Sequence, residues 1–340
     1  MSVPPHVPTV ADVGEFGLIA RLHARFGEGG VGVVRGIGDD TAALRLTPGY
    51  LLLATTDAAV EGVHFLRAAI TPRTLGRRVL AVNLSDVASM GGIPRWALVS
   101  LSLPGETPLD FADELAAGLY EEAARFGVAL VGGNLARSPD RLVLDLTLLG
   151  EVEPDRVLYR SGARPGDRLL VTGTLGDSAA GLTILLGQAP RREPDAQTLI
   201  ERHQLPTPRV AAGRAIATSG LATAMIDLSD GLASDLSHLA EESRIGAIVE
   251  AARIPLSTAL LALARATGHD PLDWALRGGE DYELLLTAPA ERVPALIAAV
   301  EATGVALTEI GEVVAQPGLW LRQPDGEQTP LGVTHWKHFE

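Results

Sequence analysis

Apolar residues recur along the chain with the two-residue period of strands and the three-to-four-residue period of helices in turn. In the first half, the apolar stretch Tyr50–Thr56 predicts a strand that ends on Asp57. Thr71 and Pro72 predict the start of a helix that runs to Met90, because threonine caps helices and proline suits the first helical position. Further elements are expected at Trp96–Leu103, Val128–Val131 and Arg141–Val152 (strands) and at Pro108–Phe126 (a long helix).

The turn-rich segment Ser161–Asp167 predicts a hinge, after which the alternation restarts with a strand at Arg168–Thr172. The later predicted elements are a helix from Asp177, a helical pair around Pro206 to Pro208, strands at Ala222–Asp227, Glu283–Thr287, Ala306–Val314 and Leu319–Arg322, and helices from Leu232, at Ser257–Thr267 and at Ala290–Thr303. The pattern predicts an α+β protein of two successive domains, residues 1–154 and 155–340.

Composition narrows the class of protein. The 340 residues are 46% hydrophobic, enough for a large core. They include no cysteine, which excludes disulfides, zinc–thiolate sites and a cysteine nucleophile. The net charge of −14 disfavours nucleic acid as a partner. The N-terminal residues do not resemble a signal peptide, and no apolar run reaches the roughly 18 residues of a membrane span. We therefore expect a cytoplasmic protein.

Acidic residues next to glycines at strand ends are the main chemical signal. Glycine lets the backbone approach a ligand closely, and a carboxylate there can hold a cation. A turn or helix cap would explain any single site, but four such sites in one chain favour ligand binding. They are Asp39-Asp40 after Gly36–Gly38, Asp57, the group Asp227, Ser229 and Asp230, and Glu280-Asp281 after Gly278-Gly279.

Asp86 lies on a helix face that is otherwise apolar. An ionised carboxylate buried there needs a cation or donors as partner. A salt bridge to Arg77 or Arg78 is one possibility, and a metal ion is the one we favour. Carboxylates and hydroxyls without HExxH spacing of the histidines indicate a hard cation such as Mg²⁺. The face comprises Leu75, Val79, Val82, Asp86 and Met90.

Two common phosphate-binding motifs, the P-loop and the GxGxxG motif of dinucleotide-binding folds, are not supported by this sequence. The chain has no GxxxxGK[ST] loop. The GxGxxG match at Gly27–Gly32 is predicted to follow a helix instead of a strand and to lead into no helix, so it is interpreted as a flexible loop. A dinucleotide-binding fold is therefore not expected.

Taken together, the motifs resemble the thiamine-monophosphate kinase family, within the superfamily of aminoimidazole ribonucleotide synthetase. The resemblance spans nearly the whole chain in family order. It rests on GIGDDTA (36–42), TTD (55–57), His64-Phe65, AVNLSDVASMGG (81–92), VGGN (131–134), RSGARPGD (160–167), VTGTLGDSAAG (171–181), IDLSDGL (226–232) and GGEDYEL (278–284).

The resemblance implies an N-terminal α+β domain that pairs in a homodimer and a C-terminal α+β domain that completes the active site. It implies transfer of a phosphoryl group from ATP to thiamine monophosphate, with several Mg²⁺ ions. The positions that match the family's magnesium ligands are Asp40, Thr55, Thr56, Asp57, Asp86, Asp227 and Asp230; those that match ATP contacts are Gly133, Arg160 and Ser229; those that match thiamine-side contacts are His64, Glu280 and Trp336.

Asn134 departs from the family pattern, in which an aspartate that binds magnesium follows the glycine pair. Its amide oxygen can still coordinate a metal and lie near ATP, but it brings no charge.

Alternatives stay open for single residues. Arg160 fits phosphate oxygens or an interdomain salt bridge, and His64 fits the substrate or simple packing near Phe65. Glu280 fits a thiazolium-facing pocket or a turn. Trp336 fits stacking on the substrate rings or a tail anchor. Asp57, Asp86 and Arg160 are the candidates for catalysis.

The rival functions are another ATP-dependent enzyme of the superfamily, such as one like aminoimidazole ribonucleotide synthetase, and a non-catalytic nucleotide-binding regulator. The many retained carboxylates argue against the regulator.

Overall fold

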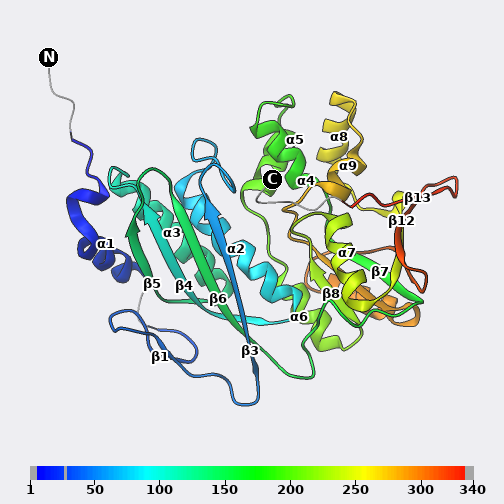
Figure 1. The fold of residues 1–340 in the computed structure, drawn as a ribbon, viewed down its shortest axis with the longest axis horizontal. Helices are drawn as coiled ribbons and strands as arrows, with labels where there is room; N and C mark the ends of the chain where they lie inside the picture. Colours follow the sequence, from blue (N-terminus) through cyan, green and yellow to red (C-terminus); the bar gives the residue numbers. More distant parts are fainter. Residues whose placement is uncertain (1–5, 27–28, 334–340) are drawn as a thin grey trace. The chain divides into compact units, whose positions relative to one another are not determined.

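The computed structural model describes residues 6–26 and 29–333 (Figure 1). The chain forms two compact units. Unit 1 comprises Met1–Leu84 and Pro94–Glu151, and unit 2 comprises Ser85–Ile93 and Val152–Glu340. Each unit combines helices with its own main sheet, which confirms the predicted α+β class. The end of one helix, from Ser85 onward, belongs to unit 2, a division that the sequence pattern did not reveal.

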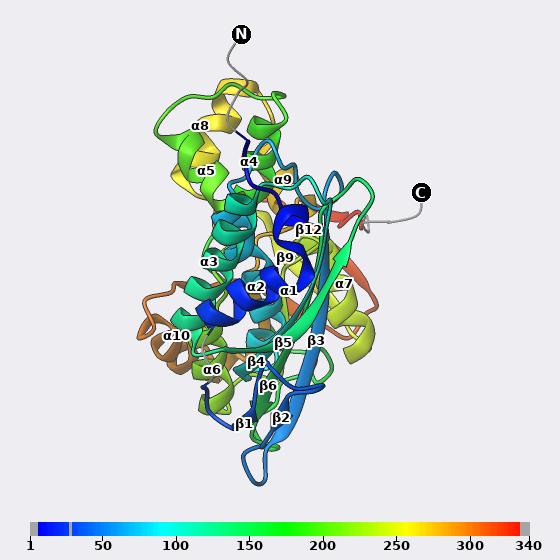
Figure 2. The ribbon, with the colours of Figure 1, turned by 90° about the vertical axis from the view of Figure 1, so that its left-hand side faces the viewer.

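Unit 1 is built on a four-stranded sheet in the order β3-β6-β4-β5 and a small β1-β2 pair. Figure 2 shows its helices and strands from the side. Its elements are α1 (Val10–Phe26), β1 (Val33–Arg35), β2 (Ala43–Leu44), β3 (Leu51–Val60), α2 (Pro72–Ser89), β4 (Ile93–Leu103), α3 (Leu109–Phe126), β5 (Ala129–Arg137) and β6 (Val143–Val152).

Alternation along β6 shows how this sheet is covered. Leu144, Leu146 and Leu148 are fully buried, whereas Asp145 and Thr147 on the opposite face are only partly buried. Because successive side chains of a strand point to opposite faces, one face of the sheet packs into the core and the other stays more open.

Unit 2 contains a seven-stranded sheet in the order β13-β12-β9-β11-β7-β10-β8, in which β12 and β9 run parallel. Its elements are β7 (Asp167–Thr172), α4 (Asp177–Leu185), α5 (Asp195–Gln204), α6 (Val210–Ser219), β8 (Ala224–Asp227), α7 (Leu232–Ser243), β9 (Gly246–Glu250), η1 (Ala251–Arg253), α8 (Thr258–Thr267), α9 (Pro271–Arg277), β10 (Leu284–Pro289), η2 (Ala290–Arg292), α10 (Val293–Glu301), β11 (Leu307–Val314), β12 (Gly318–Arg322) and β13 (Gln328–Pro330).

Helices cover both faces of the seven-stranded sheet. Leu169 and Leu285 pack in one core cluster with Leu236 of α7. Their neighbours in the strands point the other way, and Leu170 packs with residues of α6 and α10. A third cluster joins α4, α5, α8 and α9, which lie together at the top of Figure 1. The alternation predicted from the sequence therefore produces a sheet buried on both sides.

Most predicted elements are confirmed within one to three residues, including the helical pair α5 and α6 around Pro206 to Pro208. One expectation is wrong: Asp57 does not end its strand, because β3 continues to Val60. None of the helices in the described part of the chain combines the length and apolar character needed to cross a bilayer.

Candidate active site

Two carboxylates of unit 2 form the centre of the candidate site. Asp227 is the last residue of β8 and is 4% exposed, and Asp86 lies in the last turns of α2. Ser85 donates its hydroxyl hydrogen to Oδ2 of Asp227 at 2.7 Å. The predicted strand end and the predicted helix face thus bring an aspartate of the first half of the sequence close to one of the second half.

Electrostatics make this pair a candidate cation site. Burial, followed by the nearby charge of Asp86, raises the pKa of Asp227 to about 7, although Ser85 and Arg160 oppose the rise. Asp86 also lies near the C-terminal end of α2, where the helix dipole disfavours negative charge. Two ionised carboxylates in this position repel each other unless a cation or a proton is shared between them.

Asp235, which the sequence analysis missed, supports the same region. Its Oδ2 accepts hydrogen bonds from the backbone N–H groups of Asp230 and Gly231, at 3.0 and 3.1 Å, and so fixes the loop after β8. Burial, with the charges of Asp227 and Asp230, raises the pKa of Asp235 to about 8. In the sequence, the feature that could have indicated Asp235 is its position four residues after Gly231, in the first turn of α7.

The prediction for Asp86 needs correction in two respects. Its side chain is not fully buried, since Asp86 is of intermediate exposure along with Val82 and Met90, so the predicted face is not the most buried one. Arg77, considered as its partner, pairs instead with Glu122 at 2.9 Å.

Arg160 and Ser229 lie in loops of unit 2 that other residues hold. The side-chain hydroxyl of Ser243 donates to the carbonyl of Arg160 at 2.9 Å and accepts from the N–H groups of Gly162 and Ala163. Arg160 is exposed, and its positive charge acts on Asp227. Such an exposed guanidinium, beside acidic groups, is suited to a phosphate that arrives with its own metal.

The loop that carries Glu280 folds back on the loop that carries Ser229. The N–H of Glu280 donates to the carbonyl of Ser229 at 2.7 Å, and the N–H of Tyr282 donates to that of Leu228 at 2.8 Å. Gly279 permits this approach, because a Cβ there would lie 2.5 Å from the Ser229 carbonyl oxygen. Glycine at this position is therefore a steric requirement.

In unit 1 the predicted ligands Thr55, Thr56 and Asp57 do not share one face of the sheet. Thr56 donates its hydroxyl hydrogen toward Asp145 Oδ1 at 3.0 Å, and Thr147 donates to Thr56 at 3.2 Å, on the more open face. Strand alternation turns Thr55 and Asp57 to the opposite face. Only the latter two side chains can therefore serve a common ion.

The other candidates of unit 1 are more exposed. Asp40 lies in an exposed turn after β1, and its N–H donates to Oδ1 of Asp39 at 3.0 Å. Gly133 and Asn134 are exposed in β5, opposite Val99 and Ser100 of β4. Gly133 also has a packing role, because a Cβ there would lie 1.9 Å from the Val99 carbonyl oxygen.

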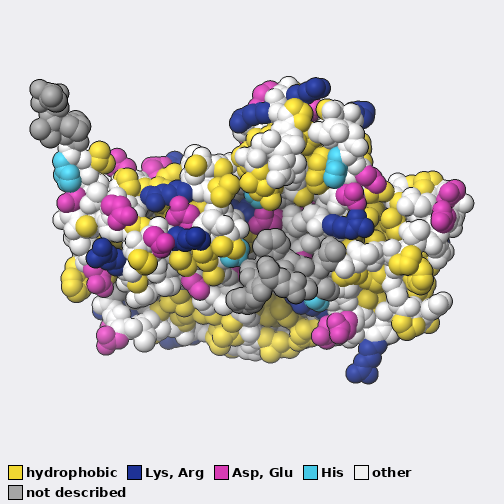
Figure 3. Space-filling view, turned by 45° about the horizontal axis from the view of Figure 1, so that its top comes forward, with side chains coloured by type: hydrophobic (Ala, Val, Ile, Leu, Met, Phe, Trp, Pro, Cys, Tyr) yellow, Lys and Arg dark blue, Asp and Glu magenta, His cyan; other side chains and the backbone are white. Residues whose placement is uncertain are grey.

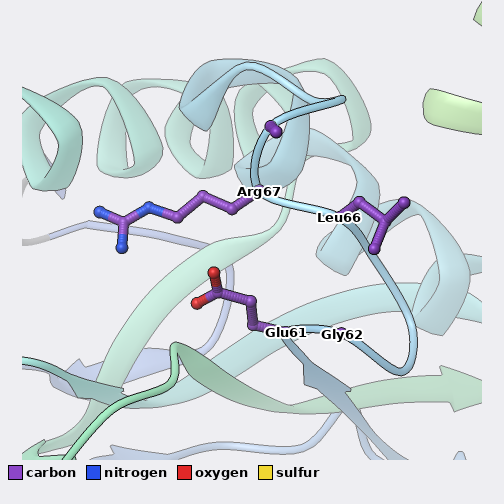
Figure 4. A pocket seen from close by; sticks show the side chains of 5 residues that line it. Glu61, Gly62, Leu66 and Arg67 are labelled. Carbon is purple, nitrogen blue, oxygen red and sulfur yellow. The ribbon is translucent and has the colours of Figure 1, made fainter.

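His64 lies in the loop between β3 and α2, where its Nδ1 accepts the N–H of Val60 at 3.1 Å. Other residues of the same loop, among them Glu61, Leu66 and Arg67, line an open surface hollow of about 560 Å³ (Figure 4). Trp336 lies outside the described residues. Within residues 6–26 and 29–333, no three or more His, Asp or Glu side chains lie together in an arrangement that could hold a metal ion.

Comparison with known proteins defines the class. Residues 38–152 match the N-terminal domain of AIR synthase related proteins, and residues 164–322 match the C-terminal domain of the same family. The thiamine-monophosphate kinase of Escherichia coli (strain K12) is 42% identical over 328 residues, covering 96% of this chain and 98% of that protein.

Solved structures place the chain in the same family as the sequence comparison does. The thiamine-monophosphate kinase from Stenotrophomonas maltophilia K279a superposes with a TM-score of 0.82 at 38% identity, covering 95% of this chain and 99% of that one. AaThiL complexed with AMPPCP and TMP gives a TM-score of 0.77 at 36% identity, covering 99% and 100% of the two chains. This chain belongs to the thiamine-monophosphate kinase family of AIR synthase related proteins.

Proposed function

We propose that this protein phosphorylates thiamine monophosphate, using ATP, to give thiamine diphosphate and ADP. The curated relatives are thiamine-monophosphate kinases along nearly the full chain. One related structure holds AMPPCP, a non-hydrolysable ATP analogue, together with TMP. The observation in this protein that carries the proposal is the Asp86–Asp227 pair beside Ser85 and Arg160, since it combines a site for a cation with a guanidinium for phosphate.

Carboxylates that crowd a buried position fit a hard divalent cation, which prefers oxygen ligands. We propose that Asp86, Asp227 and Asp230 in unit 2, and Asp40, Thr55, Asp57 and Asn134 in unit 1, hold the Mg²⁺ ions of the reaction. The hydroxyl of Thr56 faces away from Asp57 and is the weakest member of the predicted set. Held by these residues, Mg²⁺ would offset the negative charge of the phosphates and of the leaving group.

The remaining predicted residues bind the two substrates. Gly133, Asn134, Arg160 and Ser229 are proposed for ATP. Arg160 suits the phosphates because its guanidinium is permanently charged and planar. His64, Glu280 and Trp336 are proposed for thiamine monophosphate, where the carboxylate of Glu280 complements the positive thiazolium ring.

Transfer needs no general base. The phosphate of thiamine monophosphate, with a second pKa of about 6, is mostly ionised at neutral pH. One of its oxygens forms a bond to the γ-phosphorus of ATP, while the bond from that phosphorus to the β,γ-bridging oxygen breaks and ADP leaves with the electron pair. The residues of the chain position the two anions and offset their repulsion. No phosphoenzyme forms.

We also propose a cytoplasmic homodimer. The support for a dimer is the more open face of the unit 1 sheet, where Leu52 of the edge strand β3 is 48% exposed. Sedimentation equilibrium of the purified protein should give twice the mass of the 35.6 kDa chain.

No nucleic-acid partner is proposed. On the described part of the face in Figure 3, basic side chains are interspersed with acidic ones and form no continuous stripe.

Purified protein incubated with ATP, Mg²⁺ and thiamine monophosphate should form thiamine diphosphate and ADP in equal amounts, as measured by chromatography. Initial rates at varied concentrations of both substrates should give intersecting double-reciprocal lines, as direct transfer requires. Parallel lines or a trapped phosphoenzyme would overturn direct transfer. Absence of thiamine diphosphate at saturating substrates and metal would overturn the function.

A further inference from the structure

We propose that His203 is a positioning residue for thiamine monophosphate, acting through Glu280, and that the segment His203–Arg209 holds the Glu280 loop in its binding conformation. This inference rests on the proposed function, in which Glu280 contacts the substrate. None of the motifs quoted in the sequence analysis includes His203, which lies near the end of α5.

The contact is direct. Nδ1 of His203 lies 3.2 Å from Oε2 of Glu280 and 3.1 Å from the hydroxyl oxygen of Ser178. An ionised carboxylate can only accept hydrogen bonds, so the tautomer that suits this contact carries its hydrogen on Nδ1. The His203 side chain is 11% exposed and that of Glu280 is 30% exposed, so the contact lies at the edge of the core, with Glu280 accessible to a ligand.

Glu280 needs support because its backbone is in a conformation that favours glycine. Its φ is +67°, and that of Tyr282 is +51°. Such conformations persist only where surrounding contacts fix them, and they concentrate at ligand sites. Hydrogen bonds to the carbonyls of Ser229 and Leu228 fix the backbone, whereas His203 contacts the carboxylate itself.

The segment His203–Arg209 contacts the loop at a second residue, Glu283. Arg209 makes two hydrogen bonds to the Glu283 carboxylate, one of 2.7 Å from Nε, and Thr172 donates to it at 2.6 Å. Glu283 is 2% exposed, so its contact with Arg209 stabilises the fold and is not accessible to a ligand. Between the two contacts, the buried Pro206 and Pro208 restrict the backbone of the connecting segment.

Between these points, Asp281 anchors the loop to α4. Its carboxylate accepts the N–H of Gly176 at 2.8 Å and that of Ser178 at 3.5 Å. Ser178 therefore meets both the backbone anchor and the imidazole. The loop is held at the partly buried Asp281 and at the buried Glu283, neither of which is proposed to face the substrate. At Glu280, in contrast, His203 contacts a side chain that is proposed to face the substrate.

The test compares His203→Asn with His203→Gln. Both are neutral amides, but asparagine places an N–H where Nδ1 stands, whereas glutamine places it one bond further out. His203→Gln should raise the KM for thiamine monophosphate about tenfold, the cost of a lost charge-assisted hydrogen bond, while His203→Asn should stay within about twofold of the wild type. The KM for ATP should change little in either variant.

Two further variants separate positioning from general destabilisation. Leu199 lies on the same helix as His203 and is fully buried in the core cluster that joins α4, α5, α8 and α9. Leu199→Ala should therefore lower the melting temperature without a selective change in the KM for thiamine monophosphate. In a Glu280→Gln background, His203→Gln should add little, because both changes remove one contact.

Equal KM values for thiamine monophosphate in His203→Asn and His203→Gln, or additive effects of His203→Gln and Glu280→Gln, would overturn this inference while leaving the kinase function intact. A wild-type protein that forms no thiamine diphosphate would overturn the function and the inference together.

Discussion

Asp227 of unit 2 and two proposed ligands of unit 1, Asp40 and Asn134, lie in opposite environments. Asp227 is almost fully buried, takes a hydrogen bond from Ser85 and is raised in pKa by burial and by Asp86. Asp40 and Asn134 are exposed, one in a turn and one in β5. Asp227 therefore carries an electrostatic cost in the metal-free protein, and a bound cation would relieve that cost.

The difference teaches that ligands for one reaction can be pre-arranged to different degrees. Asp235 fixes the loop after β8 with two backbone hydrogen bonds, so Asp227 and Asp230 are held before any ion arrives. The exposed residues of unit 1 are better suited to join a metal that already carries nucleotide phosphates.

The largest expected effect is on activity, and it should be common to both units. Asp86→Ala, Asp227→Asn and Asp57→Ala should each lower kcat by a factor of about a thousand, since each removes a proposed metal ligand worth several kcal/mol. Asp155→Asn, at an exposed side chain, is the matched control. Near-normal turnover at saturating Mg²⁺ in a variant shown to be folded by circular dichroism would remove that residue from the set.

The next effect is on stability and should arise in unit 2. The pKa values of Asp227, about 7, and Asp235, about 8, are raised above the ordinary value of 3.8. Between the ordinary value and the raised ones, the folded protein therefore binds more protons at these two residues than the unfolded chain does. The free energy of unfolding of the metal-free protein should therefore fall by several kcal/mol in total from about pH 4 to pH 8. Urea unfolding in EDTA measures it; stability that is constant or rises from pH 5 to pH 8 would contradict this origin.

A smaller effect separates the units directly. At pH 8 without metal, Asp227→Asn should raise the free energy of unfolding by about 1–3 kcal/mol, because it removes a buried charge and keeps an acceptor for Ser85. Asp40→Asn should change it by less than about 0.5 kcal/mol, as expected for an exposed site. The comparison between the units fails if both variants shift stability equally in urea titrations.

The smallest effect concerns Asn134. Restoring the family's carboxylate with Asn134→Asp should lower the Mg²⁺ concentration for half-maximal rate a few-fold, because a charged oxygen attracts the ion more strongly than an amide oxygen. The rate at saturating metal should change less. Mg²⁺ titrations at fixed ATP, with free metal calculated, decide it, and an unchanged or weaker metal dependence would place Asn134 outside the ligand set.

The sequence predicted those features that depend on local pattern. Alternation identified β4, β6, β7 and β11, and the threonine and proline at 71 and 72 identified the start of α2, where the Thr71 hydroxyl accepts the N–H of Thr74. The strand β9 was not assigned, and Asp57 was placed at a strand end although β3 continues to Val60. The end of the apolar stretch did not mark the end of that strand, because the polar residues Thr55 to Asp57 continue the alternation of more buried and more exposed side chains along β3.

The site was only partly predictable for a related reason. Motifs identified Asp86 and Asp227, but their proximity depends on the last turns of α2 belonging to unit 2, which no local pattern encodes. Asp235 and His203 were missed because their roles arise from contacts across the fold, to Gly231 and Glu280. Thr56 was grouped with its neighbours although strand alternation already separates it from them.

The cation site at Asp86 and Asp227 is tested most directly by the rise in melting temperature on adding Mg²⁺ without substrates. Wild-type protein should show a larger rise at pH 8.5 than at pH 6, because protons compete for Asp227 at the lower pH. Asp227→Asn should show little rise at either pH, while Asp40→Asn should behave as the wild type. Equal Mg²⁺-dependent rises in wild type and Asp227→Asn at pH 8.5 would contradict a cation site at this pair.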